Sequence, residues 1–191
     1  AADLSDAAGV DTLLADLPTV DILVNNAGIF GPEDFFETED ATWERYWQTN
    51  VMSGVRLSRA LLPAMVAAGW GRVLFISSES ARNIPADMIH YGVSKTAQLS
   101  LSRGLAKRVA GSGVTVNAVL PGFILTEPGA RVRGRYEALS DEDRQDMTRS
   151  VPLGRPGTPE EVAKAVTFLA SDDASFLTGL AIPVDGARSI R

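Results

Sequence analysis

Tyr91 and Lys95 are the residues whose types and spacing point most directly to chemistry. They stand four apart at the start of a predicted helix, so they share one face. A lysine ammonium near a phenol stabilises the phenolate and lowers its pKa, and such a phenol can serve as a general acid and base near neutral pH. Ser78 ends the preceding predicted strand, where its hydroxyl can reach the same cavity. This set predicts a proton-transfer site, although a solvated helix face can carry the same Tyr-Lys pair.

Asn50 is a fourth candidate, in the middle of a long predicted helix. A mid-helix Asn is mildly unfavourable because its side chain competes for backbone hydrogen bonds. Its plain interpretation is an exposed surface residue. Small residues follow each predicted strand and would let a flat ligand approach the backbone, although ordinary turns favour the same types. These strand ends are Asn25–Gly28, Ser77–Ser80, Pro121–Ile124 and Asp185–Gly186.

The elements that must position these residues alternate between strand and helix. Continuously apolar segments predict buried strands, as in parallel sheets, at 21–25, 72–77, 114–120 and 180–184. Helices are expected before Pro18, over 42–68, 90–109 and 140–149, and from 159, with Asp3, Ser5 and Asp6 each able to cap the first. This alternation predicts an α/β, doubly wound parallel sheet in three α/β/α layers, with residues 1–191 in one domain. Ligands in such sheets bind at the carboxyl ends of the strands.

The composition excludes several other functions. The chain has no cysteine, which excludes disulfides, thiolate metal sites and a cysteine nucleophile. Its single histidine, His90, cannot build the usual zinc site, so no metal is expected. A serine hydrolase is disfavoured because no Gly-x-Ser-x-Gly motif occurs. The net charge of −6 argues against nucleic-acid binding. No apolar run of about 18 residues and no signal segment is seen, so we expect no membrane span and a cytoplasmic protein.

Taken together and in order, these residues resemble the short-chain dehydrogenase/reductase family. The resemblance runs from Asp3 to the C-terminus and rests on Asn25-Asn26-Ala27-Gly28, Asn50, Ser78, Tyr91-x-x-x-Lys95, Val116-Asn117, Pro121-Gly122, Thr126 and Val184-Asp185-Gly186. It implies a Rossmann-type fold and hydride transfer between NAD or NADP, which the sequence does not distinguish, and a carbonyl/alcohol pair. A 3-oxoacyl-type reductase is one candidate activity. The alternatives are a non-catalytic nucleotide-binding scaffold and a truncated, inactive fragment.

The resemblance also implies a role for each matching residue. Tyr91 would be the proton donor or acceptor, Lys95 would lower the Tyr91 pKa and bind the nicotinamide ribose, and Ser78 would polarise the substrate oxygen. Asn50 would hold a water that links Lys95 to solvent. The other implied cofactor contacts are Asp3 and Leu4 at the adenine, Asn26, Ala27 and Gly28 along the adenosine ribose, Ile124 and Thr126 at the carboxamide, and Pro121 and Gly122 beside them.

Four features of the sequence bear on this resemblance. The family's Gly-rich phosphate turn and first strands have no counterpart before Asp3, so we expect the given sequence to be incomplete at its N-terminus. Glu79 stands where a small or apolar residue is more usual; it could favour a cationic or hydroxylated substrate, but we expect it to point to solvent. Ala187 replaces a second glycine, with little consequence expected. His90 should lie at the surface or an interface, since neighbouring helical residues point in different directions.

Residues 125–151 occupy the position of the family's substrate lid. A long polar segment of this kind in a compact domain is usually functional. Arg131, Arg133 and Arg135 within it could contact an acidic substrate, such as a phosphopantetheine-bearing acyl group, but we expect a solvated charge run. A homo-oligomer, dimer or tetramer, is implied through the two long helices and the last strand. Leucines on those helices could serve either that interface or the core: Leu57, Leu61, Leu99, Leu101 and Leu105.

Overall fold

The computed structural model describes residues 2–126, 134 and 136–190. Four parallel strands form one sheet in the order β1 (Ile22–Asn25), β2 (Gly71–Ile76), β3 (Val114–Pro121) and β4 (Ala181–Val184). In its register Val24 is opposite Leu74, and Leu74 is opposite Asn117. All four strands lie where the apolar segments predict them, which confirms the parallel α/β sheet.

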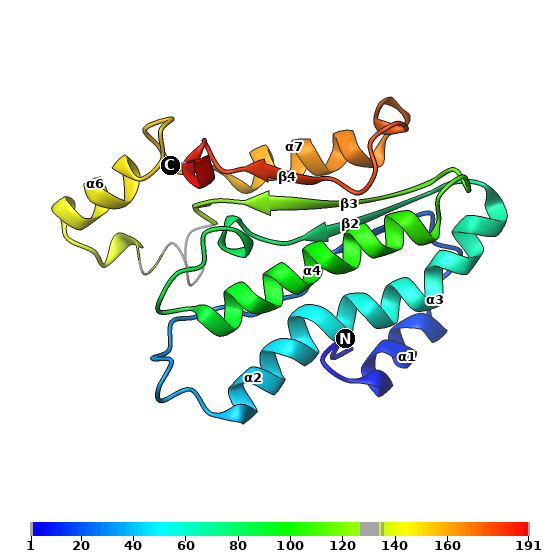
Figure 1. Ribbon diagram of the computed structural model, residues 1–191, viewed down its shortest axis with the longest axis horizontal. Coiled ribbons are helices and arrows are strands. Elements are labelled where there is room, and N and C mark those ends of the chain that lie inside the picture. Colours follow the sequence, from blue (N-terminus) through cyan, green and yellow to red (C-terminus); the bar gives the residue numbers. More distant parts are fainter. Residues whose placement is uncertain (1, 127–133, 135, 191) are drawn as a thin grey trace.

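Helices cover both faces of the sheet and complete the three predicted layers (Figure 1). The helices α1 (Ala7–Ala15), α3 (Ser53–Ala68) and α4 (Ile89–Arg108) enclose one core, and α7 (Pro159–Ala170) encloses a smaller one on the other face. The five leucines that could serve either the core or an interface belong to the first core. Leu57 and Leu99 are buried in it, and Leu61, Leu101 and Leu105 pack against it while partly exposed.

The run from Asp40 to Ala68 differs from the single α-helix predicted over 42–68. It consists of α2 (Asp40–Tyr46), a π-helical turn η1 (Trp47–Met52) and α3. Such π-turns are rare and often occur at functional sites. By length and composition alone the whole run could cross a membrane, a test that core helices of soluble proteins also pass. Here α3 packs against β1 and β2, and α2 and η1 pack against α4.

The helix ends follow the capping chemistry that the sequence indicates. Of the three candidate caps before α1, Asp6 is the one used, and its carboxylate accepts from the N–H of Gly9 at 2.7 Å. Thr158 and Glu161 form a capping box at the start of α7. Ser140 caps α6 (Asp141–Arg149), which buries none of its residues. Three short 3-10 turns complete the described elements: η2 (Glu79–Ala81), η3 (Asp172–Ala174) and η4 (Arg188–Ile190).

Candidate functional site

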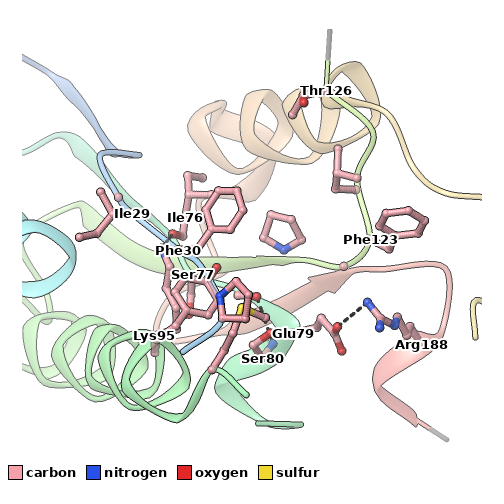
Figure 2. A pocket seen from close by; sticks show the side chains of 18 of the residues that line it. Ile29, Phe30, Ile76, Ser77, Glu79, Ser80, Lys95, Phe123, Thr126 and Arg188 are labelled. Carbon is pink, nitrogen blue, oxygen red and sulfur yellow. Dashed lines mark hydrogen bonds and ion pairs between the residues drawn. The ribbon is translucent and has the colours of Figure 1, made fainter. Parts of the chain in front are cut away.

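The carboxyl ends of β1, β2 and β3 open onto a cavity of about 610 Å³ (Figure 2). Its lining comes from the segments that follow these strands and from the start of α4. The sequence-predicted residues in this lining are Asn26, Gly28, Ser78, Tyr91, Lys95, Pro121, Gly122, Ile124 and Thr126. Asp3 and Leu4 are not among them: Asp3 is exposed before α1, and Leu4 packs against the core.

Lys95 is a buried cation with only neutral hydrogen-bond partners. Its residue is 5% exposed, and Nζ donates to the backbone oxygen of Ile76 at 2.8 Å and to Oε1 of Gln98 at 3.3 Å. Among the described residues no carboxylate lies within ion-pairing distance of Nζ. Loss of solvation therefore lowers the pKa of Lys95 to about 8. An ammonium has three donors, so one remains for a ligand in the cavity that Lys95 lines.

Tyr91 lies one turn before Lys95, with Nζ 5.7 Å from the ring centroid. Burial raises the pKa of Tyr91; the hydrogen bond with the Ser78 side chain lowers it in part, and Tyr46 and Glu79 raise it further. The net shift of the Tyr91 pKa is therefore upward, opposite to the expected lowering, because desolvation of the phenolate outweighs the effects that stabilise it. The phenol is thus protonated at neutral pH.

Two serines at the end of β2 fix the geometry around this pair. Ser77 donates from Oγ to the backbone oxygen of Lys95 at 2.9 Å, which holds α4 against the strand end. Oγ of the buried Ser78 accepts from the N–H of Ser80 at 3.1 Å and thereby caps η2. The position of the Ser78 hydroxyl is set by its own turn, so it is already in place beside Tyr91.

Asn50 is not the exposed surface residue of the plain interpretation. It is 0% exposed inside the π-turn η1. Its Oδ1 accepts from the N–H of Ile29 at 2.8 Å, and Nδ2 donates to the backbone oxygen of Ile29 at 3.0 Å and to Oγ of Ser94 at 2.9 Å. The Asn50 side chain therefore connects the loop after β1 to both η1 and α4.

The loop after β1 and the segment after β3 present backbone groups to the cavity. A Cβ on Gly28 would stand 3.4 Å from Oδ1 of Asn50 and 3.5 Å from Nζ of Lys95, so the glycine leaves this edge open. Ile124 forms a parallel bridge with Gly157 through the backbone groups of Phe123 and Leu125. This bridge does not use the N–H and C=O of Ile124 itself, which could bind a carboxamide.

Two expectations about neighbouring residues are wrong. Glu79 does not point to solvent: it is 5% exposed and pairs at 2.9 Å with Nη1 of Arg188, which also lines the cavity (Figure 2). Burial raises the pKa of Glu79, Arg188 lowers it and Asp185 raises it. His90 is buried against Tyr46, with ring centroids 4.3 Å apart, rather than at the surface. Helix α2 folds over the start of α4 and covers it.

The segment proposed as a lid contributes part of the cavity wall. Tyr136, Leu139 and Met147 line it, and the Tyr136 ring lies 5.6 Å from that of Phe123. Arg131, Arg133 and Arg135 fall outside the described residues. Within the described part of the chain no cluster of His, Asp or Glu could hold a metal ion.

Sequence reasoning missed Ser94, Gln98 and Arg188. Ser94 and Gln98 each stand three residues after a predicted catalytic residue, so helical spacing alone placed them on the same face. Arg188 had no such signal, because it reaches Glu79 from a distant part of the chain.

Comparison with known proteins now fixes the family. A family model described as Enoyl-(Acyl carrier protein) reductase matches residues 2–187. The chain belongs to the short-chain dehydrogenase/reductase family. Among curated proteins, it is 41% identical to "Uncharacterized oxidoreductase YvaG" of Bacillus subtilis over 96% of this chain and 73% of that one. It is 38% identical to "3-oxoacyl-[acyl-carrier-protein] reductase FabG" of Haemophilus influenzae, over 96% of this chain and 74% of the relative.

Solved structures of this family share the fold. A putative gluconate dehydrogenase from Agrobacterium tumefaciens superposes with a TM-score of 0.90 at 28% identity, covering 98% of this chain and 74% of that one. A 3-oxoacyl-[acyl-carrier protein] reductase from Brucella melitensis with bound NAD gives a TM-score of 0.84 at 28% identity, covering 97% of this chain and 69% of that one. As a short-chain dehydrogenase/reductase, the chain is an NAD(P)-dependent oxidoreductase of CH–OH and C=O groups.

Proposed function

We propose that the enzyme reduces a 3-oxoacyl-type carbonyl to a secondary alcohol, with Tyr91 as the general acid. The observation that carries this proposal is the presence of Ser78, Tyr91 and Lys95 together in the lining of one cavity. The Tyr91 phenol is hydrogen-bonded by Ser78 and keeps its proton at neutral pH. A protonated phenol is what reduction requires, because the product alkoxide must receive a proton.

The residues around the cavity suit a nicotinamide cofactor. Lys95 retains a donor for a ribose hydroxyl, Gly28 leaves room for the sugar, and Ile124 offers an N–H and a C=O to an amide. We assign Asn26 and Ala27 to the adenosine ribose, Thr126 to the carboxamide, and Pro121 and Gly122 to the adjoining wall. Asp3 and Leu4 would meet only the far adenine end. When bound, NADH or NADPH supplies the hydride.

The chain's own residues then handle the substrate oxygen. The Ser78 hydroxyl, held by its turn, donates to the carbonyl oxygen and polarises it. Tyr91 gives its phenolic proton to the same oxygen as the C–O bond becomes single, and the nearby Lys95 ammonium stabilises the phenolate that remains. In the oxidation direction Tyr91 takes the proton back.

The lid and the assembly complete the proposal. Residues 125–151 serve as the substrate lid. Among its described residues, Tyr136, Leu139 and Met147 line the cavity and suit an acyl chain. The enzyme works in the cytoplasm as a dimer or tetramer. Exposed apolar side chains at Phe168, Phe176 and Leu180 support an interface beside β4.

The test is a reduction assay with acetoacetyl-N-acetylcysteamine as the 3-oxoacyl probe and NADH or NADPH as the reductant. Consumption of the reduced nicotinamide should depend on the probe and should disappear in Tyr91→Phe. Reduction of gluconate-derived or other small ketones without reduction of the probe would replace the substrate class. Cofactor binding without turnover of any carbonyl would favour the non-catalytic scaffold.

A further inference from the structure

Gln98 is a buried polar side chain that touches two parts of the site. It is 2% exposed and lies on α4, one turn after Lys95. A buried amide without partners would be costly, and Gln98 has a partner at each end. Oε1 accepts from Nζ of Lys95 at 3.3 Å, and Nε2 donates to the backbone oxygen of Asn50 at 2.6 Å.

The chemistry of the two partners permits only one orientation of the amide. The Lys95 ammonium can only donate and the Asn50 carbonyl can only accept. Gln98 therefore spans from Lys95 to the backbone of the π-turn with its acceptor at one end and its donor at the other. Glutamate cannot reproduce this arrangement, since it would place a carboxylate oxygen against the Asn50 carbonyl.

The contact joins α4 to the π-turn η1, which contains Asn50. Gln98 is one of two α4 residues that reach Asn50, the other being Ser94, which accepts from its side chain. The two contacts lie on either side of Lys95 along α4 and fix the helix against η1. Gln98 thus gives the Asn50 backbone a direct side-chain link to the Lys95 ammonium.

We infer that Gln98 is a positioning residue that keeps the Lys95 ammonium charged and aimed at the cavity by bridging it to the Asn50 carbonyl. The catalytic consequence rests on the proposed roles of Tyr91 and Lys95. The other groups around Nζ are the Ile76 carbonyl below it and the Tyr91 ring on the same helix. Two carboxylates line the same cavity, Asp87 and Glu79, and Glu79 pairs with Arg188; neither is within ion-pairing distance of Nζ.

Two substitutions separate this role from a purely structural one. Gln98→Met keeps the length of the side chain but removes the acceptor, so the midpoint for titration of Lys95 should fall by about one pH unit. Gln98→Glu gives Lys95 a charged acceptor, so the midpoint should rise by about one unit or more. Both variants lose the donor to Asn50, so packing damage alone would act on both in the same direction.

The midpoint is measured without cofactor or substrate by the rate of acetylation of Lys95 with acetic anhydride across pH, read by peptide mass spectrometry. The chain has three lysines, and the exposed Lys107 and Lys164 are internal references. Ser102→Ala, another buried polar residue of α4, is the matched control and should leave the midpoint unchanged. Midpoints that stay at the wild-type value in both Gln98 variants, or that move in the same direction, overturn the inference.

The same variants connect the inference to turnover. The basic limb of the kcat profile should move to lower pH in Gln98→Met and to higher pH in Gln98→Glu. If the Lys95 midpoints move in opposite directions while the kcat profile stays fixed, the inferred contact stands and the proposed catalytic role of Lys95 falls.

Discussion

Replacing Lys95 by methionine should reveal how much burial of the Lys95 ammonium lowers the free energy of unfolding. Desolvation lowers the pKa of Lys95 from 10.5 to about 8. A difference of about 2.5 units corresponds to roughly 3 kcal/mol of folding free energy. Below pH 8 both the folded and the unfolded chain hold the proton, so the whole cost is present. Between about pH 8 and 10.5 the folded state releases its proton first, so the cost shrinks as the pH rises.

The wild-type free energy of unfolding should therefore rise relative to Lys95→Met by about 3 kcal/mol between pH 7 and pH 10.5. The substitution also leaves the acceptors of Ile76 and Gln98 without their donor, at about 1–3 kcal/mol each. The loss of these two hydrogen bonds varies little with pH. The test is therefore how the difference in unfolding free energy between wild type and variant changes with pH, and not its absolute value. Tyr91 does not titrate first, because burial raises its pKa.

The assay is equilibrium unfolding in urea at several values between about pH 7 and pH 10.5, with the variant subtracted from wild type. The subtraction removes the titration of all other groups. Lys107→Met, at an exposed position on the same helix, should give a difference that does not change with pH. A flat difference for Lys95→Met as well, or one of opposite sign, would refute the claim that Lys95 is a desolvated cation.

Three further substitutions test other parts of the site. Asn50→Ala removes three hydrogen bonds and should lower the free energy of unfolding by about 3 kcal/mol in urea titrations; an unchanged midpoint would contradict the tethering of the loop. Gly122→Ala would place a Cβ 2.5 Å from that of Asp185, so its Tm should fall, whereas Gly104→Ala meets nothing within 4 Å and should not lower Tm by a comparable amount. Glu79→Gln removes a charge that raises the pKa of Tyr91. The pH at which Tyr91 ionises, followed by phenolate absorbance with Tyr91→Phe as the background, should move to lower pH, and an unmoved or rising midpoint would count against that coupling.

Much of the fold could be predicted because its signals are local. The strand 114–120 is continuously apolar and becomes the buried β3, and Thr158 with Glu161 predicts the start of α7 by capping alone. The π-turn could not be predicted in this way. Asn50 lies inside it and contacts Ile29 and Ser94, which only the assembled helices and loop bring together.

The site shows the same division. Helical spacing placed Tyr91 and Lys95 on one face, and the strand end brought Ser78 to them. The direction of the Tyr91 pKa shift was wrong because burial is a tertiary property, and Glu79 was wrongly expected in solvent because its partner, Arg188, comes from far along the chain. Each error came from a contact or an environment that no short stretch of sequence encodes.

The most direct test of the central claim compares Tyr91→Phe with wild type in two measurements on the same preparations. Titration with the reduced nicotinamide measures cofactor binding, and a single turnover with acetoacetyl-N-acetylcysteamine measures reduction. If Tyr91 is the general acid, the variant binds the cofactor as wild type does and forms less than about one hundredth of the alcohol in the same time. Reduction by Tyr91→Phe at a near wild-type rate would contradict the account, because the proton would then come from another group.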